Sequence, residues 1–354
     1  MTSNSTKVRV GVIGVGIGRS HLKGYSNVAE AEVAAICDLD EARAHAAVEQ
    51  FGLDNATIYT DHRALLENPD IDAVSVCLPN FLHQPIAVEA LNAGKHVICE
   101  KPLAMTAAQA QEIADAAERN GRKCMVAQVN RFRQDSQYLK KVLSENQLGD
   151  IYYAHCGVLR RSGIPGYGGW FTTKSKSGGG PLIDLGVHLL DLTWWLAGSP
   201  KPVSVTGVTY AEFGPHKKGI GRWGVEQKTE GTFDVEDLAA AFIRFENGLT
   251  INLEVSWALY LEKTKMWSHL YGKKGGAAWG DNVTLISDIN GAPATTHVDV
   301  PAGDSWTGEM QHFIDSIIND TPTDPGADQG VTMMKMLEAI YKSAETKREV
   351  IIEA

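Results

Sequence analysis

Short apolar runs alternate with helix-like segments in the first third of the chain, and this alternation constrains the fold more than any other feature. Val8–Ile13 is the first apolar run, and residues 73–78 read as a fully buried strand. The intervening segments have helical spacing, and two of them end at Gly52 and Gly121, as helices often do. Strands separated by helices imply right-handed βαβ units. We therefore expect an α/β fold with a doubly wound parallel sheet covered by helices on both faces.

The pattern changes near residue 129, where strand-like runs begin to follow one another with only turns between them. Such runs occupy residues 203–211, 237–245 and 249–255, and Asn247-Gly248 is a strong hairpin signal between the last two. Turn-connected strands indicate a mainly antiparallel sheet. Because 354 residues exceed the usual size of one domain, we predict two. Residues 1–128 should hold the parallel sheet, and residues 129–354 should form an α+β domain with a large, mostly antiparallel open sheet.

Composition excludes several classes of protein. The net charge of −10 disfavours nucleic acid and anionic membranes as main partners, and no apolar run reaches the roughly 18 residues that span a bilayer. The polar start MTSNSTKVRVGVIG enters a strand and does not read as a secretory signal. The five cysteines are odd in number and lack C-x-x-C spacing, which favours buried, reduced thiols. We therefore expect a cytoplasmic, enzyme-like protein.

A glycine-rich loop follows the first apolar run and should open a helix. Glycines let the backbone approach a pyrophosphate, and a helix N-terminus supplies N–H donors and a positive dipole. The third glycine comes one residue early for the G-x-G-x-x-G pattern, whose sixth place is Arg19, so a simple tight turn is the alternative. The residues predicted to bind a dinucleotide here are Gly14, Gly16, Ile17 and Gly18.

The end of the next strand bears on which dinucleotide binds. Asp38 stands there, twenty residues after Gly18. A carboxylate at this place accepts hydrogen bonds from the ribose hydroxyls and repels a 2′-phosphate, which favours NAD over NADP. Arg19 and Arg43 are phosphate partners that would weaken this preference, so NADP is the alternative cofactor. Asp38 could instead cap the next helix, a role for which Asp40 competes.

Polar residues follow the carboxyl ends of the other predicted strands. Ligands of open parallel sheets bind beyond these ends, so the residues should gather along one edge in line with a dinucleotide. His83 lies one short loop further on, and either contacts the cofactor or sits in the first turn of the next helix. The further residues predicted to bind the cofactor are Leu78, Pro79, Asn80, Glu100, Lys101 and Gln128.

Lys101 is the first candidate for the chemistry. It comes directly after an apolar strand, at the sheet edge where the nicotinamide should end, and Pro102 restricts its backbone to extended geometry. A neutral amine there would accept a proton, whereas a charged one would polarise a hydroxyl or carbonyl oxygen. An ordinary surface lysine is the alternative.

The second candidate is the segment GGGPLIDLGVHLLDLTWWLAG. Residues 182–196 read as one helix that is apolar nearly all round and should be buried. Asp184 and His188 lie one helical turn apart on one face, so they need partners or a wet cleft. An imidazole paired with a carboxylate suits general acid–base catalysis. A structural network is one alternative. A metal site is another, but neither Cys nor an H-E-x-x-H pattern accompanies these residues, and we predict no metal.

The loop before this helix, RRSGIPGYGGWFTTKSKSGGG, carries residues for substrate contacts. Its glycines permit movement, and its aromatic rings suit packing on a sugar face or on the nicotinamide. Trp170 is the strongest of these residues and is also predicted to contact the cofactor. Besides Lys101, Asp184 and His188, the residues predicted to bind substrate are Arg131, Arg160, Tyr167 and Trp170.

These motifs resemble those of the glucose–fructose oxidoreductase / inositol dehydrogenase (Gfo/Idh/MocA) family. The resemblance rests on CLPNFLHQPIAVEAL, KHVICEKPLA, VNRF, SGGGPLIDLGVHLLDLTWWLAG and ADQGVTMMKMLEAIYKSAETKREV, and it covers nearly the whole chain. It implies an N-terminal Rossmann domain and a C-terminal α/β domain whose open sheet often forms dimer or tetramer contacts. It also implies that Lys101, Asp184 and His188 are the catalytic set. The cofactor contacts that it implies are Gly14, Gly16, Asp38, Pro79, Asn80, Glu100 and Trp170.

The sequence therefore predicts an NAD(H)-dependent oxidoreductase that transfers hydride between nicotinamide and a secondary hydroxyl or ketone of a sugar, sugar derivative or cyclic polyol. His188 would take the hydroxyl proton, Lys101 would stabilise the alkoxide or share that proton, and Asp184 would hold a neighbouring hydroxyl or orient the pair. The alternatives are an NAD-dependent glycoside hydrolase using transient oxidation and elimination, and a non-catalytic nucleotide-binding sensor. We expect a homodimer or homotetramer formed through the C-terminal sheet.

Overall fold

The computed structural model describes residues 7–221 and 229–353, which form two compact units. The first unit combines Met1–Phe132 with Asp304–Met334, and the second combines Arg133–Gly303 with Lys335–Ala354. The chain therefore crosses between the units more than once, which departs from the single boundary predicted after residue 128. The expectation about a secretory signal rested partly on residues 1–6, which lie outside the described part.

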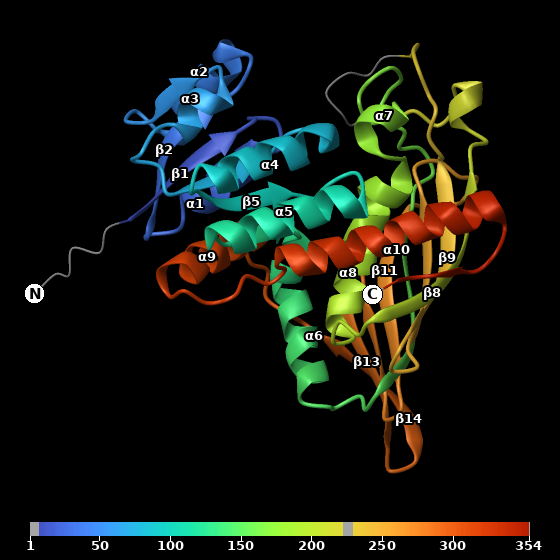
Figure 1. Ribbon diagram of the computed structural model, residues 1–354. Helices are drawn as coiled ribbons and strands as arrows, with labels where there is room; N and C mark the ends of the chain where they lie inside the picture. The colour runs from blue at the N-terminus through green and yellow to red at the C-terminus, as the bar shows by residue number, and fades with distance from the viewer. Residues whose placement is uncertain (1–6, 222–228, 354) are drawn as a thin grey trace, which may run out of the picture. The chain divides into compact units, whose positions relative to one another are not determined.

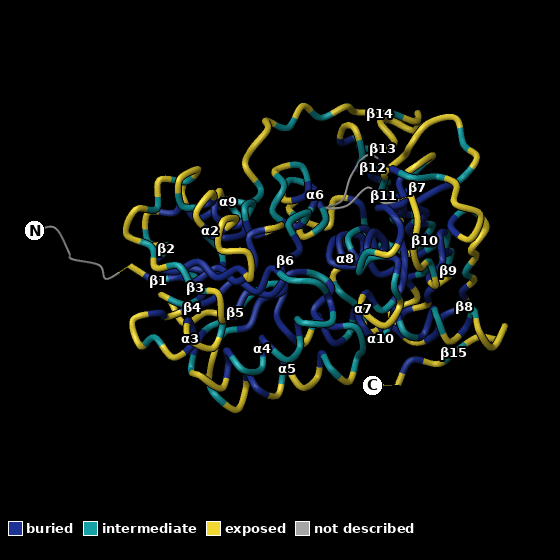
Figure 2. The backbone as a smooth tube through the Cα atoms, turned by 90° about the horizontal axis from the view of Figure 1, so that it is seen from above, coloured by how far each residue is buried: buried dark blue, intermediate teal, exposed yellow. Residues whose placement is uncertain are grey.

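A six-stranded parallel sheet in the order β3-β2-β1-β4-β5-β6 forms the centre of the first unit. Figure 2 shows α2 and α9 on one face of this sheet and α3, α4 and α5 on the other, with the strands buried between them. This is the doubly wound arrangement that the sequence predicts. Its elements are β1 (Val8–Ile13), α1 (Gly18–Tyr25), β2 (Ala31–Cys37), α2 (Glu41–Phe51), β3 (Thr57–Tyr59), α3 (His62–Leu66), β4 (Ala73–Val76), η1 (Asn80–Leu82), α4 (His83–Asn92), β5 (His96–Glu100), α5 (Ala107–Asn120), β6 (Cys124–Ala127), η2 (Val129–Phe132) and α9 (Ser305–Ile318).

Helix α9 returns to the first unit because α1 offers it a close-fitting surface. A Cβ atom on Gly24 of α1 would lie 2.7 Å from both the Trp306 carbonyl oxygen and the Met310 side chain, so the two helices meet almost backbone to backbone. Met310 and Phe313 are fully buried in the core that also holds Val10 and Val12. This contact explains why a late segment of the chain completes the first unit.

The second unit is built on a nine-stranded sheet in the order β14-β13-β12-β11-β7-β10-β9-β8-β15. Its neighbours are antiparallel except for β7 and β10, which run parallel. The sheet is therefore mostly antiparallel, as predicted. Its elements are α6 (Gln134–Ser144), β7 (Ile151–Leu159), α7 (Lys174–Ser177), η3 (Leu182–Gly186), α8 (Val187–Leu196), β8 (Pro202–Tyr210), η4 (Gly214–His216), β9 (Leu238–Phe245), β10 (Thr250–Ser256), β11 (Lys265–Gly272), β12 (Gly276–Trp279), β13 (Val283–Ile289), β14 (Ala292–Val298) and β15 (Val350–Ile351) (Figure 1).

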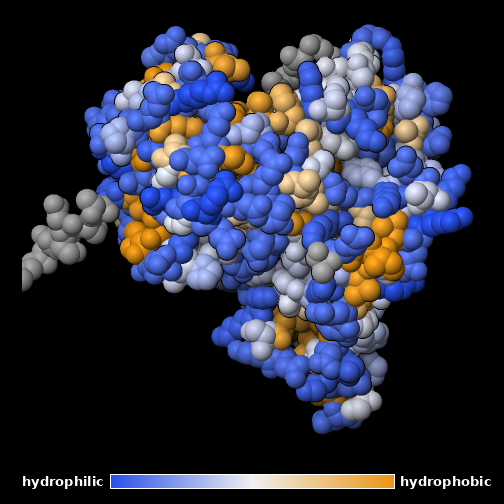
Figure 3. Space-filling view, in the orientation of Figure 1, coloured by the Kyte–Doolittle hydropathy of each residue, from blue (hydrophilic) through white to orange (hydrophobic). Residues whose placement is uncertain are grey.

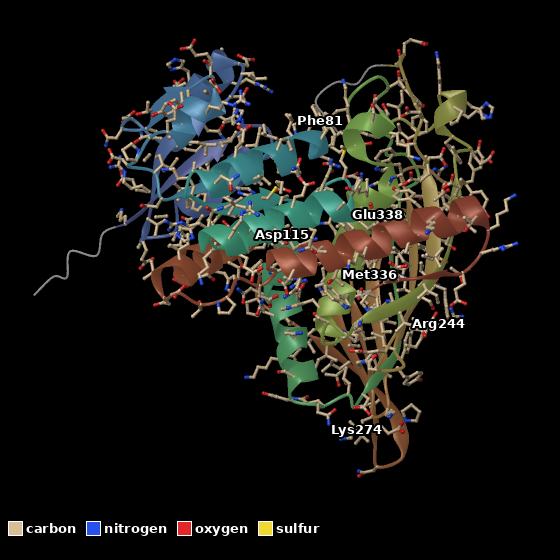
Figure 4. All side chains as sticks on the ribbon, in the orientation of Figure 1. Phe81, Asp115, Arg244, Lys274, Met336 and Glu338 are labelled. Carbon is tan, nitrogen blue, oxygen red and sulfur yellow. The ribbon has the colours of Figure 1, made fainter. Side chains whose placement is uncertain are left out.

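Helices cover one face of this second sheet, and none of the described helices covers the other. In β9 and β10, buried residues such as Ile243 and Leu253 alternate with more exposed ones such as Phe242. Helix α10 (Ala327–Thr346) supplies part of the cover: its Met336 is fully buried, and Ile340 packs against Gly207 of β8 (Figure 4). A strand that alternates in this way packs one face on a core and leaves the other open.

All five cysteines lie in the described part and are free and buried. Burial raises the pKa of the Cys124 and Cys156 thiols to about 12. Burial, helped by the neighbouring charge of Asp38, raises that of Cys37 to about 12 as well. A thiol whose pKa is this high is almost never a thiolate near neutral pH. The five free, buried cysteines confirm the prediction of buried, reduced thiols.

Candidate active site

The glycine loop in the first unit leaves room at the N-terminus of α1. Gly14 has φ +91°, and a Cβ there would lie 2.4 Å from the Cys77 carbonyl oxygen; one on Gly18 would lie 3.0 Å from Val12 Cγ1. A Cβ on Gly16 would meet nothing within 4 Å. Packing therefore requires glycine at 14 and favours it at 18, while Gly16 faces open space. No side chain caps α1, so this loop fits a pyrophosphate.

Asp38 stands at the end of β2 and is buried. Its Oδ2 accepts a hydrogen bond from the Val15 N–H of the glycine loop at 2.9 Å. Its Oδ1 accepts from the Asp40 N–H at 2.9 Å and from the Arg43 guanidinium at 2.8 Å. Asp40 is the residue that caps α2, so Asp38 is not the helix cap. Arg19 bonds instead to Gln50 of α2. The carboxylate is thus fixed where the ribose of a dinucleotide is expected.

His83 joins the loops that follow β4 and β5. It is the first residue of α4 and is fully buried, and Phe81 marks the preceding turn in Figure 4. One ring nitrogen lies 2.6 Å from the Leu78 carbonyl oxygen and the other 2.7 Å from that of Pro102. Burial lowers the pKa of this imidazole against the opposing effect of the two carbonyls. The ring therefore fixes the loops beside the predicted cofactor contacts, and its own contact with the cofactor stays a prediction.

Glu100 and Lys101 end β5 and form a small buried polar network. Glu100 Oε1 lies 3.2 Å from His21 Nε2, and its Oε2 accepts the Lys101 N–H at 3.1 Å. Burial raises the pKa of Glu100, but the hydrogen bond from His21 and the charges of His21 and Lys101 outweigh it, so the pKa is lowered. The Lys101–Pro102 peptide bond is cis. Glu100 therefore holds the backbone from which the candidate catalytic lysine projects.

Two further predicted residues follow β6 in the same unit. Gln128 and Arg131 are almost fully buried. The Arg131 guanidinium donates to Asp324 Oδ1 at 2.6 Å and to Gln329 Oε1 at 2.7 Å. These bonds join the β6 loop to the late segment of the chain, and a substrate contact by Arg131 stays a prediction.

In the second unit, the parallel pair of strands β7 and β10 brings two residues together where both strands end. β7 and β10 run side by side up to the pair Leu159 and Ser256. The residues directly after them, Arg160 and Trp257, therefore meet, and the Arg160 N–H donates to the Ser256 carbonyl at 3.2 Å. The segment that carries Asp184 packs against both strands, and Asp184 itself contacts Trp257.

That segment is not the single α-helix that the sequence predicts. Leu182–Gly186 forms a π-helical turn, and the α-helix α8 begins only at Val187. A π-turn inserts one extra residue into the helix and is frequent at functional sites. The turn lies against the sheet, since a Cβ on Gly186 would be in ordinary van der Waals contact with Val255 at 3.6 Å. Asp184 thus lies on the π-turn, and His188 lies in the first turn of α8.

Asp184 is held by a side chain that the sequence analysis missed. The Trp257 indole N–H donates to Asp184 Oδ2 at 2.9 Å, and the tryptophan is fully buried. Burial lowers the pKa of Arg160, and the negative charge of Asp184 opposes this shift, so guanidinium and carboxylate are near enough to interact. The second unit therefore gathers Arg160, Asp184 and Trp257 at one sheet edge.

Glu236 and Tyr341 explain two of the three glycines before the π-turn. Its buried carboxylate accepts the Gly180 N–H at 2.9 Å, the Leu182 N–H at 3.1 Å and the Tyr341 O–H at 2.9 Å. A Cβ on Gly179 would lie 2.0 Å from the Tyr341 hydroxyl oxygen, and one on Gly180 would lie 2.0 Å from the Glu236 carbonyl oxygen. Burial raises the pKa of Glu236. This carboxyl group anchors the entry to the π-turn, and it was also missed.

The aromatic residues of the preceding loop have different surroundings. Tyr167 is buried, and its hydroxyl donates to the Lys218 carbonyl at 3.1 Å. Trp170 is half-buried and stacks on Phe171, with ring centroids 3.7 Å apart. The predicted substrate contacts of Tyr167 and Trp170, and the predicted cofactor contact of Trp170, stay predictions.

Two general features of the described residues bear on function. Over residues 7–221 and 229–353, no three His, Cys, Asp or Glu side chains are grouped as a metal ion requires. Within the same ranges no helix has the length and apolar character to cross a membrane. The surface seen in Figure 3 is mainly hydrophilic, with smaller apolar patches among the polar residues.

Comparison with known proteins agrees with this fold over its whole length. The profile described as "Oxidoreductase family, NAD-binding Rossmann fold" matches residues 8–128, and that described as "Oxidoreductase family, C-terminal alpha/beta domain" matches residues 140–352. The chain is 36% identical to D-glucoside 3-dehydrogenase of Escherichia coli K12, over 97% of both chains. It is 30% identical to a putative UDP-kanosamine synthase oxidoreductase subunit of Amycolatopsis mediterranei, over 96% of this chain and 97% of that one.

Solved structures share the same architecture. Levoglucosan dehydrogenase in complex with NADH and levoglucosan superposes with a TM-score of 0.86 at 24% identity, covering 99% of this chain and all of that one. An oxidoreductase domain protein from Kribbella flavida gives a TM-score of 0.88 at 23% identity, over 99% of this chain and all of that one. At these identities the likeness supports the fold.

The fold and the profiles define an NAD-binding oxidoreductase with a Rossmann unit and an α/β unit. The chain belongs to the Gfo/Idh/MocA oxidoreductase family. It is an enzyme of the dehydrogenase type with NAD as its cofactor, so the alternative of a non-catalytic sensor is not retained.

Proposed function

We propose that this enzyme oxidises a secondary hydroxyl of a sugar, sugar derivative or cyclic polyol, and that D-glucosides oxidised at C3 are the first substrates to test. The full-length similarity to D-glucoside 3-dehydrogenase supports this substrate class. The observation that carries the proposal is the buried Asp184 carboxylate, held at the edge of the second sheet with His188 following on α8. Carboxylates are good acceptors for sugar hydroxyls.

Three side chains would perform the proton chemistry. The chemistry that NAD⁺ would supply when bound is acceptance of the hydride from the carbinol carbon. His188 accepts the hydroxyl proton as the general base. Lys101 stabilises the negative charge that develops on the substrate oxygen or shares the proton. Asp184 accepts a hydrogen bond from a neighbouring hydroxyl and so selects the orientation of the ring.

The test is turnover with NAD⁺ on a panel of methyl glucosides, anhydrosugars and inositols, followed by NADH absorbance. We expect NADH formation with at least one member, and C3 oxidation where that member is a glucoside. A nitrophenyl glucoside in the same panel reports the hydrolytic alternative. Release of nitrophenol without accumulation of NADH would favour that alternative, and no turnover on the whole panel would overturn the proposal.

We also propose that the second unit forms homodimer or homotetramer contacts through the sheet face that its own helices leave uncovered. On this face Val208, Tyr210, Phe242 and Tyr271 are 38–49% exposed. Arg244, on the same face of β9, pairs with Glu349 at 2.7 Å (Figure 4). An apolar face with a polar border is typical of subunit contacts. Light scattering should show an oligomer, and Phe242→Glu with Tyr271→Glu should reduce it to a monomer.

A further inference from the structure

We propose that Trp257 is a positioning residue for catalysis, acting through the Asp184 carboxylate. The inference rests on the proposed function, because it concerns how the second unit presents Asp184 to substrate. An indole N–H is a donor only, so its bond to Asp184 Oδ2 has one possible direction. Trp257 is fully buried, so water does not replace a partner that the N–H loses.

The donor is fixed by the sheet and not by a mobile loop. Trp257 directly follows β10, and its backbone N–H donates to the Asp237 carbonyl at 2.9 Å. Asp237 is itself anchored, because its Oδ2 accepts the Phe213 N–H at 2.6 Å and the Gly214 N–H at 2.9 Å. The indole therefore has a defined position relative to the strand ends before any ligand arrives.

The acceptor lies on the π-turn, whose entry is fixed by the bonds from the Gly180 and Leu182 N–H groups to Glu236. The Asp184 N–H donates to the Gly180 carbonyl at 3.1 Å, so the backbone of Asp184 is fixed as well. The bond from Trp257 holds one oxygen of the carboxylate itself, which also lies near the charge of Arg160. Holding one oxygen limits rotation of the group, and a preoriented carboxylate loses less entropy when it binds a hydroxyl.

A second tryptophan of this unit provides a matched control. Trp194 of α8 is also buried, and its indole N–H donates to the Pro200 carbonyl at 2.7 Å. Trp194→Phe removes a comparable hydrogen bond without touching Asp184. It measures what the loss of any buried indole costs the unit.

The test is a double-mutant cycle between Trp257 and Asp184 on the best substrate of the panel, with NAD⁺ affinity measured in parallel. Trp257→Phe should lower kcat/KM about 10- to 100-fold in the natural chain, as expected for a hydrogen bond to a charged group. It should change kcat/KM by less than about 2-fold in an Asp184→Ala background. NAD⁺ affinity should stay unchanged, and Trp194→Phe should keep kcat/KM within about 2-fold.

A merely structural tryptophan would give a different pattern. Equal losses in both backgrounds would overturn the inference while leaving the proposed function intact. If Trp257→Phe does not fold, 3-benzothienylalanine at position 257 keeps the ring shape and removes only the N–H. If kcat/KM in that variant equals that of the natural chain, the inference is overturned. A fall in kcat/KM like that predicted for Trp257→Phe would support it. Absence of turnover by the natural chain on the whole panel would overturn the proposed function and the inference with it.

Discussion

The Asp38 carboxylate and the Arg43 guanidinium are joined at 2.8 Å at the end of β2, beside the glycine loop. In the proposed cofactor site this carboxylate would have two effects. It would accept hydrogen bonds from the ribose hydroxyls, and it occupies an arginine that is otherwise a ready partner for a phosphate. We therefore predict that cofactor choice depends on the pair and not on Asp38 alone.

Replacing Asp38 should change the cofactor preference through the arginine that it releases. Asp38→Ser replaces the charged carboxylate, which would accept from both ribose hydroxyls, by a weaker neutral acceptor, and it removes the charge that repels a 2′-phosphate. The value of kcat/KM with NAD should therefore fall about 10-fold or more. Arg43 is then available to the phosphate, and the NADP/NAD ratio of kcat/KM should rise at least about 10-fold. Steady-state kinetics with both cofactors measure this. In the Asp38→Ser/Arg43→Gln chain this rise in the NADP/NAD ratio should vanish. An unchanged rise in that chain would show that Arg43 does not bind the 2′-phosphate.

Alanine substitutions at Gly14 and Gly16 should have different effects, the first on stability and the second on NAD binding. Gly14→Ala places a Cβ 2.4 Å from the Cys77 carbonyl oxygen at φ +91°, so the free energy of unfolding should fall by about 2 kcal/mol or more. A Cβ added at Gly16 would meet nothing within 4 Å, so Gly16→Ala should change the free energy of unfolding by less than about 1 kcal/mol. The added methyl group should instead obstruct the pyrophosphate and weaken NAD binding about 10-fold or more. Thermal unfolding without NAD, and titration calorimetry with it, separate the two outcomes. Similar destabilisation in both variants would contradict this assignment.

Much of the fold could be predicted because its signals are local. The apolar runs and the Asn247-Gly248 turn depend on residues a few positions apart, and both are found as predicted. The structure also decides between Asp38 and Asp40, the two candidates for the cap of α2, in favour of Asp40. The same holds for the parallel sheet, whose strand ends place Asp38 and Lys101 at one edge. Local periodicity and turn chemistry are sufficient for such features.

The features that were missed depend on partners distant in sequence. Trp257 is 73 residues from Asp184 and reads as an ordinary core tryptophan. Glu236 is 56 residues from Gly180, and only the folded sheet brings them together. The π-turn has no periodicity of its own, since a short apolar segment fits α and π geometry equally well. The run of three glycines was the available signal, because it indicates close approach by another group.

His188 and Lys101 should be required for turnover. His188→Asn and Lys101→Met should each lower kcat about 10²- to 10⁴-fold, as expected when a group that transfers or stabilises a proton is lost. For His188→Asn, NAD affinity should stay close to natural, because the histidine lies in the second unit and the cofactor profile covers residues 8–128. His216→Asn alters an exposed histidine of the second unit and should keep kcat within about 2-fold. Near-normal kcat in both the His188 and the Lys101 variants would contradict the catalytic assignment.

His96 should make the first unit sensitive to acid. It begins β5, and its Nδ1 accepts the Lys123 N–H at 2.9 Å, which requires an unprotonated nitrogen. Burial, together with the charges of Arg122 and Lys123, lowers the pKa of this histidine from its ordinary 6.5 to about 4. Between these two values the unfolded chain binds the proton and the folded chain does not, so stability is present above pH 6.5 and is lost as the pH falls toward 4. His96→Asn keeps an acceptor for the Lys123 N–H but does not titrate. The free energy of unfolding should therefore fall by about 2 kcal/mol less between pH 7.5 and pH 5 in this variant than in the natural chain. Urea unfolding at pH 7.5 and pH 5, with His45→Asn on α2 as the control for loss of an imidazole, measures the difference. An unchanged decline in His96→Asn would assign the acid sensitivity to other groups.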